Sequence, residues 1–178
     1  MVDGQPCRYP VGAPVNYRLR LGAGPTEGFA LVRDALQLMA NVSGLEFRFD
    51  GTFYEMTEVD FSARCLWIAF VNPEDGDAGG THGLGDMVLG LGGPVINGRD
   101  IVGGSVRIGN DPSVKPGFGP GHTLGGVLLH ELGHALNLDH VDVQTELMFP
   151  CVTDLSPDGF GPGDRMGLWL LGAGRGPY

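Results

Sequence analysis

Hydrophobic and polar positions alternate along the segment VNYRLRL, Val15–Leu21, a pattern that predicts a β-strand with one buried face. In the next segment, PTEGFALVRDALQLMANVSG, apolar residues recur at helical spacing and form one stripe. Thr26 is expected to cap the start of this helix, and Gly44 is expected to end it. The residues of the stripe are Phe29, Val32, Leu36 and Met39.

Two further segments are expected to be strands: LEFRF, Leu45–Phe49, and CLWIAFV, Cys65–Val71, which is apolar enough to be central in a sheet. The loop-rich region 72–121 contains two short strand candidates, DMVLGL and IVGGSVRIG. The order of these elements predicts an α+β fold, with a twisted mixed sheet of about five strands and a crossover helix.

The segment TLGGVLLHELGHALNL, Thr123–Leu138, is apolar on most of its helical circumference and is expected to be a buried helix. A short C-terminal helix is expected over Asp164–Leu171, capped by Asp164 and ended by Gly172. The sequence shows no internal repeat and no linker, so residues 1–178 are expected to form a single domain.

Composition and charge narrow the classes of function. The chain has 178 residues, which suits one core, and no apolar run approaches the roughly 20 residues that span a bilayer. The formal net charge of −10 repels phosphate groups, so we expect neither a nucleic-acid partner nor an anionic membrane surface. We also expect a monomer. The opening MVDGQPCRYPVG lacks the basic start and the apolar segment of a signal peptide.

The three cysteines, Cys7, Cys65 and Cys151, lack the close pairing of a cysteine zinc site. Either one disulfide with one free thiol or three reduced thiols fits the sequence. Cys65 adjoins the apolar stretch LWIAFV and is expected to be a small buried side chain.

Three of the five histidines fall within HELGHALNLDH, residues 130–140. His130 and His134 are one helical turn apart on the same face, which lets both imidazoles reach one zinc ion at about 2.1 Å. Glu131 is rotated by about 100° from His130 and is placed to accept a proton from a zinc-bound water as general base. This is the H-E-x-x-H arrangement of zinc peptidases.

His140 can join this site only if the helix ends before it. In a continuous helix His140 would lie about 9 Å beyond His134 and on another face. The chain must therefore reverse, and Asn137 stands where a residue with positive φ is needed. Two unpaired imidazoles in an apolar helix would be costly, which favours a metal site over core histidines. We predict His130, His134 and His140 as zinc ligands.

HELGHALNLDH followed by LMFP, Leu147–Pro150, resembles the metzincin signature and, within that clan, the matrixins. VNYRL, SGLEFRFDG, LWIAFV, GFGPGHTLGGVLLHELGHAL and GDRMGLWLLG also fit a bacterial-type matrixin, so the resemblance covers roughly residues 7–174. It implies a zincin-like fold and a zinc endopeptidase with one catalytic zinc, in which Glu131 is the general base. Met148 would be an apolar floor beneath the metal.

Some positions depart from the matrixin pattern. Asn137 replaces Gly, which should strain the turn by up to about 1 kcal/mol. Phe149 stands where Tyr is usual, Val141 where Ser is common, and Val152 where many matrixins carry a Tyr in the specificity pocket. No tyrosine lies two residues after Met148, which argues against astacin-like and serralysin-like relatives.

Secondary sites are weaker. The loop NPEDGDAGGTHG holds Glu74, Asp75, Asp77 and His82, in a region where matrixins often bind structural calcium and a second zinc. We favour a solvated acidic loop over such a calcium site. His122 is expected to belong to a loop rather than to a metal site. Cys7 fits a structural disulfide better than the zinc-blocking cysteine of matrixin propeptides.

Two functions follow. The first is a secreted zinc endopeptidase whose extended protein or peptide substrate pairs with the exposed strand DMVLGL. The alternative is a zinc-bearing binding domain that is catalytically silent or latent. A closed structural zinc site would need a fourth ligand, which is not evident near the motif, and Glu131 favours the enzyme.

Overall fold

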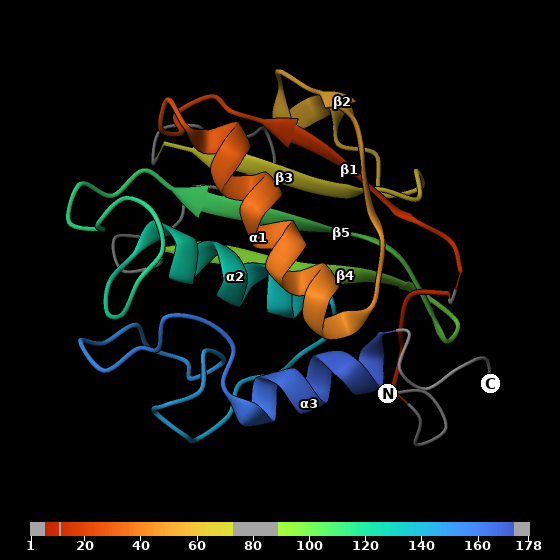
Figure 1. Ribbon diagram of the computed structural model, residues 1–178. Helices are drawn as coiled ribbons and strands as arrows, with labels where there is room; N and C mark the ends of the chain where they lie inside the picture. The colour runs from red at the N-terminus through yellow and green to blue at the C-terminus, as the bar shows by residue number, and fades with distance from the viewer. Residues whose placement is uncertain (1–5, 11, 73–88, 173–178) are drawn as a thin grey trace.

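The computed structural model of the protein describes residues 6–10, 12–72 and 89–172. It has an α+β fold with a five-stranded mixed sheet, as predicted (Figure 1). The elements in chain order are β1 Val15–Arg20, α1 Gly28–Ser43, β2 Phe47–Thr52, the 3-10 helix η1 Met56–Glu58, β3 Leu66–Val71, β4 Gly90–Asn97, β5 Asp100–Gly109, α2 Leu124–Ala135 and α3 Pro162–Leu171.

The strands lie in the order β2-β1-β3-β5-β4. All neighbouring pairs are parallel except β4 and β5, which are antiparallel, so β4 is an edge strand that runs against the others. α1 is the predicted crossover between the parallel neighbours β1 and β2. β3 is buried at every position, which confirms that the apolar run belongs at the centre of the sheet.

The helices gather on one face of the sheet, where α2 packs against β4 and β5 and α1 packs against α2 and α3 (Figure 1). Leu66, Ile68 and Phe70 of β3 point into the main core beneath these helices. Trp67 and its neighbours on the opposite face form a smaller cluster with Phe53. The zinc-motif helix α2 therefore lies on the better-covered face of the sheet.

Some predicted details of α1 are wrong. Its N-cap is Glu27 rather than Thr26, and no side chain caps the helix start. Phe29 is 40% exposed instead of buried, and its ring packs edge-on against Phe49 at a centroid distance of 5.2 Å. Gly44 does end the helix, in the left-handed conformation with φ 71°.

Other boundaries also differ from the predictions. The first residue of β2 is Phe47 rather than Leu45, and β4 begins at Gly90, so only the end of DMVLGL is in the strand, while its residues 86–88 lie outside the described residues. In α3 the N-cap is Gly161, and Asp164 is the third helical residue, whose carboxylate accepts a hydrogen bond from the Gly161 N–H (3.0 Å).

All three cysteines are free thiols, so the structural disulfide favoured for Cys7 is not formed. Cys65 is buried, as expected, and Cys151 is exposed. The Cys7 thiol lies 3.9 Å from the carbonyl oxygen of Gly98, within the buried N-terminal segment.

Candidate metal centre

The helix α2 carries two of the three clustered histidines. Its start is fixed by Thr123, whose hydroxyl accepts a hydrogen bond from the Gly126 N–H (3.2 Å). The apolar side chains of α2 on the side facing the sheet and α1, including Leu128 and Leu132, are buried in the main core. This burial fixes the rotation of the helix, so that His130 and His134 share one partly exposed face.

The helix ends at Ala135, three residues before the predicted end at Leu138, and the chain reverses at Asn137, as predicted. Asn137 has φ 76° and is the one residue other than glycine with positive φ in the described part of the chain. The N–H of Asn137 donates to the carbonyl of His134 (2.8 Å), and the N–H of Leu138 donates to that of Gly133 (2.9 Å). These two bonds form a Schellman motif, which ends the helix and returns the chain towards its own last turn.

The reversal brings His140 to the other two histidines. The Nε2 atom of His130 lies 3.1 Å from that of His134 and 3.2 Å from that of His140, and the remaining pair is 3.1 Å apart. Among the described residues, these three side chains form the group that could hold a metal ion.

The hydrogen bonds of the other ring nitrogens fit a bound cation. His130 Nδ1 lies 2.7 Å from the Leu147 carbonyl oxygen, and His134 Nδ1 lies 2.9 Å from that of Leu138. A carbonyl oxygen only accepts, so each Nδ1 carries the proton and each Nε2 keeps a lone pair. Converging lone pairs repel one another unless a cation lies between them. Three ligands at about 2.1 Å from a tetrahedral zinc would be about 3.4 Å apart, close to the observed spacing.

Burial also keeps these imidazoles in the neutral form that binds metals. Burial lowers the pKa of His130 to about 4, while its bond to the Leu147 carbonyl acts in the opposite direction. Burial lowers the pKa of His134 as well. At neutral pH both imidazoles are therefore neutral, with the proton on Nδ1, so zinc has no proton to displace from Nε2.

Glu131 is buried between α2 and the edge strand β4. Burial raises the pKa of its carboxyl group to about 7, and the backbone N–H of Gly92 partly opposes this rise. A Cβ atom on Gly90 would come within 2.6 Å of the Glu131 Cγ, and one on Gly92 would overlap the Glu131 carbonyl oxygen. The two glycines therefore allow β4 to pack directly on Glu131. The carboxyl group is thereby held next to the exposed sheet edge.

Met148 packs against α2 at Gly133. It is fully buried, and its sulfur is 2.5 Å from the position that a Cβ on Gly133 would take. Its carbonyl accepts a hydrogen bond from the N–H of Val141, the residue after His140 (3.0 Å). The two contacts join Met148 to α2 and to the segment that carries His140, and its place beneath the metal stays a prediction.

Several residues that shape this centre were not predicted from the sequence. Gly90 and Gly92 could have been noticed, because glycines inside a strand often mark a close backbone approach. Leu138 and Leu147 act through their carbonyl groups, which leave no trace in the side-chain pattern. The Glu146 carboxylate accepts hydrogen bonds from N–H groups at the start of α3 and so joins this helix to the loop 146–148. The two ends of this contact are far apart in the chain, so local spacing does not reveal it.

Of the other predicted candidates, His122 is not part of the histidine group. His122 precedes the cap of α2, and its carbonyl accepts a bond from the Lys115 N–H (2.9 Å), in agreement with a loop position. Glu74, Asp75, Asp77 and His82, with the calcium question attached to them, lie outside the described residues.

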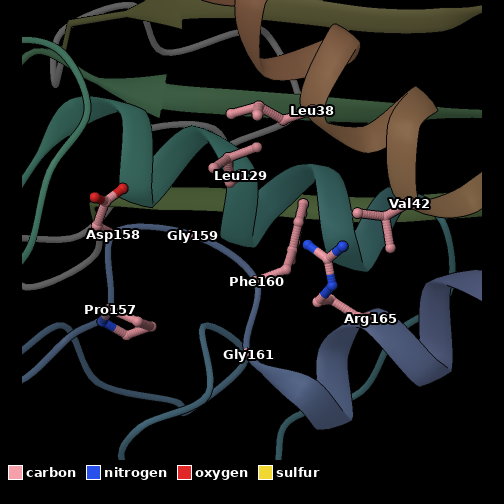
Figure 2. A pocket seen from close by; sticks show the side chains of 9 residues that line it. All are labelled: Leu38, Val42, Leu129, Pro157, Asp158, Gly159, Phe160, Gly161 and Arg165. Carbon is pink, nitrogen blue, oxygen red and sulfur yellow. The ribbon is translucent and has the colours of Figure 1, made fainter.

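A cavity of about 370 Å³ lies between α1, α2 and the segment that leads into α3 (Figure 2). None of the three histidines lines it, and neither does Glu131. This cavity is therefore separate from the candidate metal centre. Its lining residues are Leu38, Val42, Leu129, Pro157, Asp158, Gly159, Phe160, Gly161 and Arg165.

The domain combines a mixed sheet, a buried helix with the H-E-x-x-H motif and a chain reversal that brings a third histidine to the same site. This combination defines a metzincin-type zinc metalloprotease domain. The family model of peptidase family M10, Matrixin, matches residues 23–165, so the chain belongs to the matrixin family. It is 29% identical to rabbit (Oryctolagus cuniculus) macrophage metalloelastase over 119 residues. That match covers 67% of this chain and 23% of the rabbit protein.

Proposed function

We propose that the chain is the single catalytic domain of a secreted, monomeric zinc endopeptidase that cleaves extended proteins or peptides. The convergence of the three Nε2 atoms on one point, together with the buried carboxyl group of Glu131 on the same helix, carries this proposal. In the described residues, none of the helices is both long enough and apolar enough to cross a membrane.

His130, His134 and His140 would hold one zinc ion through their Nε2 atoms. When bound, zinc supplies Lewis-acid chemistry: it lowers the pKa of water towards about 7 and polarises a substrate carbonyl. The backbone carbonyls of Leu138 and Leu147 orient two of the three imidazoles through their Nδ1–H groups.

Glu131 performs the proton transfers. One carboxylate oxygen accepts the proton of the attacking water and then delivers it to the nitrogen of the leaving amine. Its burial between α2 and β4 supports this role, because burial brings the pKa of the carboxyl group to about 7, near the working range of a general base.

Among the described residues β4 pairs with β5 alone, and the substrate would add a strand on the other side of β4. Gly90 and Gly92 place the strand's backbone next to Glu131, so a substrate paired there passes the general base. Pro94 lacks an N–H group, and the pairing is therefore expected to involve the residues before it.

The test compares wild type, Glu131→Gln and the exposed control Glu27→Gln on a mixed peptide library, with cleavage read by mass spectrometry and zinc measured in parallel. Glu131→Gln should keep zinc and lose cleavage by about 10²–10⁴-fold, while Glu27→Gln should match wild type. Internal cleavages that a chelator abolishes support the endopeptidase. Zinc-loaded wild type that cleaves nothing in the library would instead indicate the binding domain.

A further inference from the structure

Two buried carboxyl groups join the loop 146–148 to the start of α3, and they reach in opposite directions. The Glu146 carboxylate accepts hydrogen bonds from the N–H groups of Gly163 (3.0 Å) and Asp164 (2.9 Å). The Asp164 carboxylate accepts from the N–H groups of Leu147 (2.6 Å) and Met148 (3.3 Å). Glu146 and Asp164 are 9% and 3% exposed. We call these two residues the carboxylate clasp.

The clasp is fitted closely into the structure. A Cβ on Gly161 would overlap the Glu146 carboxylate, and one on Gly163 would come within 3.2 Å of it. Glu146 also lies at the positive end of the α3 dipole, which favours a negative charge there. Burial raises the pKa of Asp164, and the nearby Glu146 raises it further. The two carboxylates together accept five backbone N–H hydrogen bonds, which offset the cost of burying them close to each other.

One peptide group connects the clasp to the metal centre. The carbonyl oxygen between Leu147 and Met148 accepts the Nδ1–H of His130 (2.7 Å). The N–H of the same peptide group donates to Asp164 (3.3 Å). Hydrogen bonds on both sides of an amide polarise it and strengthen each other. A negative charge at Asp164 therefore increases the electron density at the oxygen that orients His130.

We propose that Asp164, held in place by Glu146, is a positioning residue for the metal ligand His130 and acts through the Leu147–Met148 peptide group. This inference rests on the proposed zinc site. The clasp fixes the ring orientation of His130 and makes its Nε2 a better donor to the metal. His134 is bonded to the carbonyl of Leu138, which the clasp does not contact through any hydrogen bond of the described residues, and it provides an internal comparison.

The test uses zinc-loaded protein with ¹⁵N-labelled histidine and follows the Nδ1–H proton resonances of His130 and His134 by NMR. In Asp164→Asn the His130 proton should move upfield, as its hydrogen bond weakens, while the His134 proton stays in place. The zinc dissociation constant should rise about 10–100-fold. Glu146→Gln should have the same effect at smaller size. The exposed Asp158→Asn is the control and should change neither quantity.

Several results would overturn the inference. An unmoved His130 resonance in a folded clasp variant would do so, and so would equal movement of both resonances, which indicates general loosening. If Asp164→Asn does not fold, Glu146→Gln decides. Zinc-loaded wild type that cleaves no peptide removes the proposed peptidase activity but leaves the resonance and zinc measurements decisive. Wild type that binds no zinc overturns both proposals.

Discussion

Asn137 shows how one side chain can both permit a turn and anchor it. Its φ of 76° is a conformation that glycine adopts without strain and that asparagine tolerates. Its side-chain amide donates a hydrogen bond to the carbonyl of Cys7, 3.1 Å away. Glycine could form the same turn but could not make this bond. Asparagine therefore ties the buried N-terminal segment to the reversal that delivers His140.

Substitutions at Asn137 should separate these two contributions. Asn137→Gly loses about 1 kcal/mol of hydrogen bonding and regains about as much backbone strain, so stability should change little. Asn137→Asp tolerates the turn but cannot donate to Cys7, and Asn137→Val should cost more than about 1 kcal/mol through strain. Urea unfolding of the zinc-loaded proteins should rank stability as Gly above Asp and Asp above Val. Equal stability of the three variants would contradict both roles.

The third ligand can be tested against a histidine outside the cluster. His140→Ala removes one of three converging Nε2 atoms and should weaken zinc retention at least about 10-fold. His122→Ala removes a side chain from the loop before α2 and should leave zinc retention unchanged. Metal content after dialysis against a graded series of chelator concentrations gives the comparison. Equal retention in the two variants would mean that the turn does not supply a ligand.

At the scale of elements, the sequence predicted most of what periodicity can encode. Alternation and apolar runs predicted the strands, and the histidine spacing predicted where α2 must end. The errors lie where tertiary contacts decide. Phe29 is partly exposed because it packs on Phe49 rather than in the core. The start of α3 lies two residues before Asp164 because Glu146, far back in the chain, accepts its first free N–H groups.

The packing of α2 against Met148 gives a prediction about Gly133, a glycine inside this helix. Alanine is normally favoured over glycine there by about 1 kcal/mol. At Gly133, however, a Cβ would come within 2.5 Å of the sulfur of Met148, a side chain that is only 1% exposed. Gly133→Ala should therefore lower the thermal midpoint and weaken zinc binding, since both histidines of α2 must shift.

Gly126→Ala is the control on the same helix. A Cβ there meets only the cap hydroxyl of Thr123, at 3.0 Å. This variant should keep its zinc affinity, with stability near wild type. Calorimetry and zinc titration of the two proteins check the pair. A Gly133→Ala protein as stable and as zinc-avid as Gly126→Ala would show that Met148 does not hold α2 in place.

At the scale of the whole molecule, the candidate site was more predictable than the shell that supports it. The three histidines and Glu131 lie in one short segment, so their relation follows from helix geometry and one turn. Their support comes from distant parts of the chain. The Cys7 carbonyl accepts a hydrogen bond from the Asn137 side chain, and Gly90 and Gly92 leave room for Glu131. The Asp164 carboxylate bonds to the loop 146–148. Such contacts depend on the assembled fold and are not encoded in local spacing.

Burial of the Glu131 carboxyl group should make the free energy of unfolding of the whole protein depend on pH. The pKa of Glu131 rises from 4.5 to about 7 on folding, so the folded protein binds this proton more tightly than the unfolded chain does. The favourable contribution is complete below pH 4.5 and is lost as the pH rises through 7. Above that pH a buried charge destabilises the fold, by about 3 kcal/mol at most.

Glu131→Gln removes this titration while keeping the size of the side chain. With zinc removed by a chelator, the variant should be more stable than wild type at pH 7.5, and the two should converge as the pH falls to 4.5. Urea unfolding at a series of pH values measures the difference, and taking the difference cancels the opposite effect of His130, whose pKa burial lowers. The same difference at every pH would mean that Glu131 is not desolvated. A difference that grows with pH would mean that the fold gives up stability to keep a general base beside the metal site.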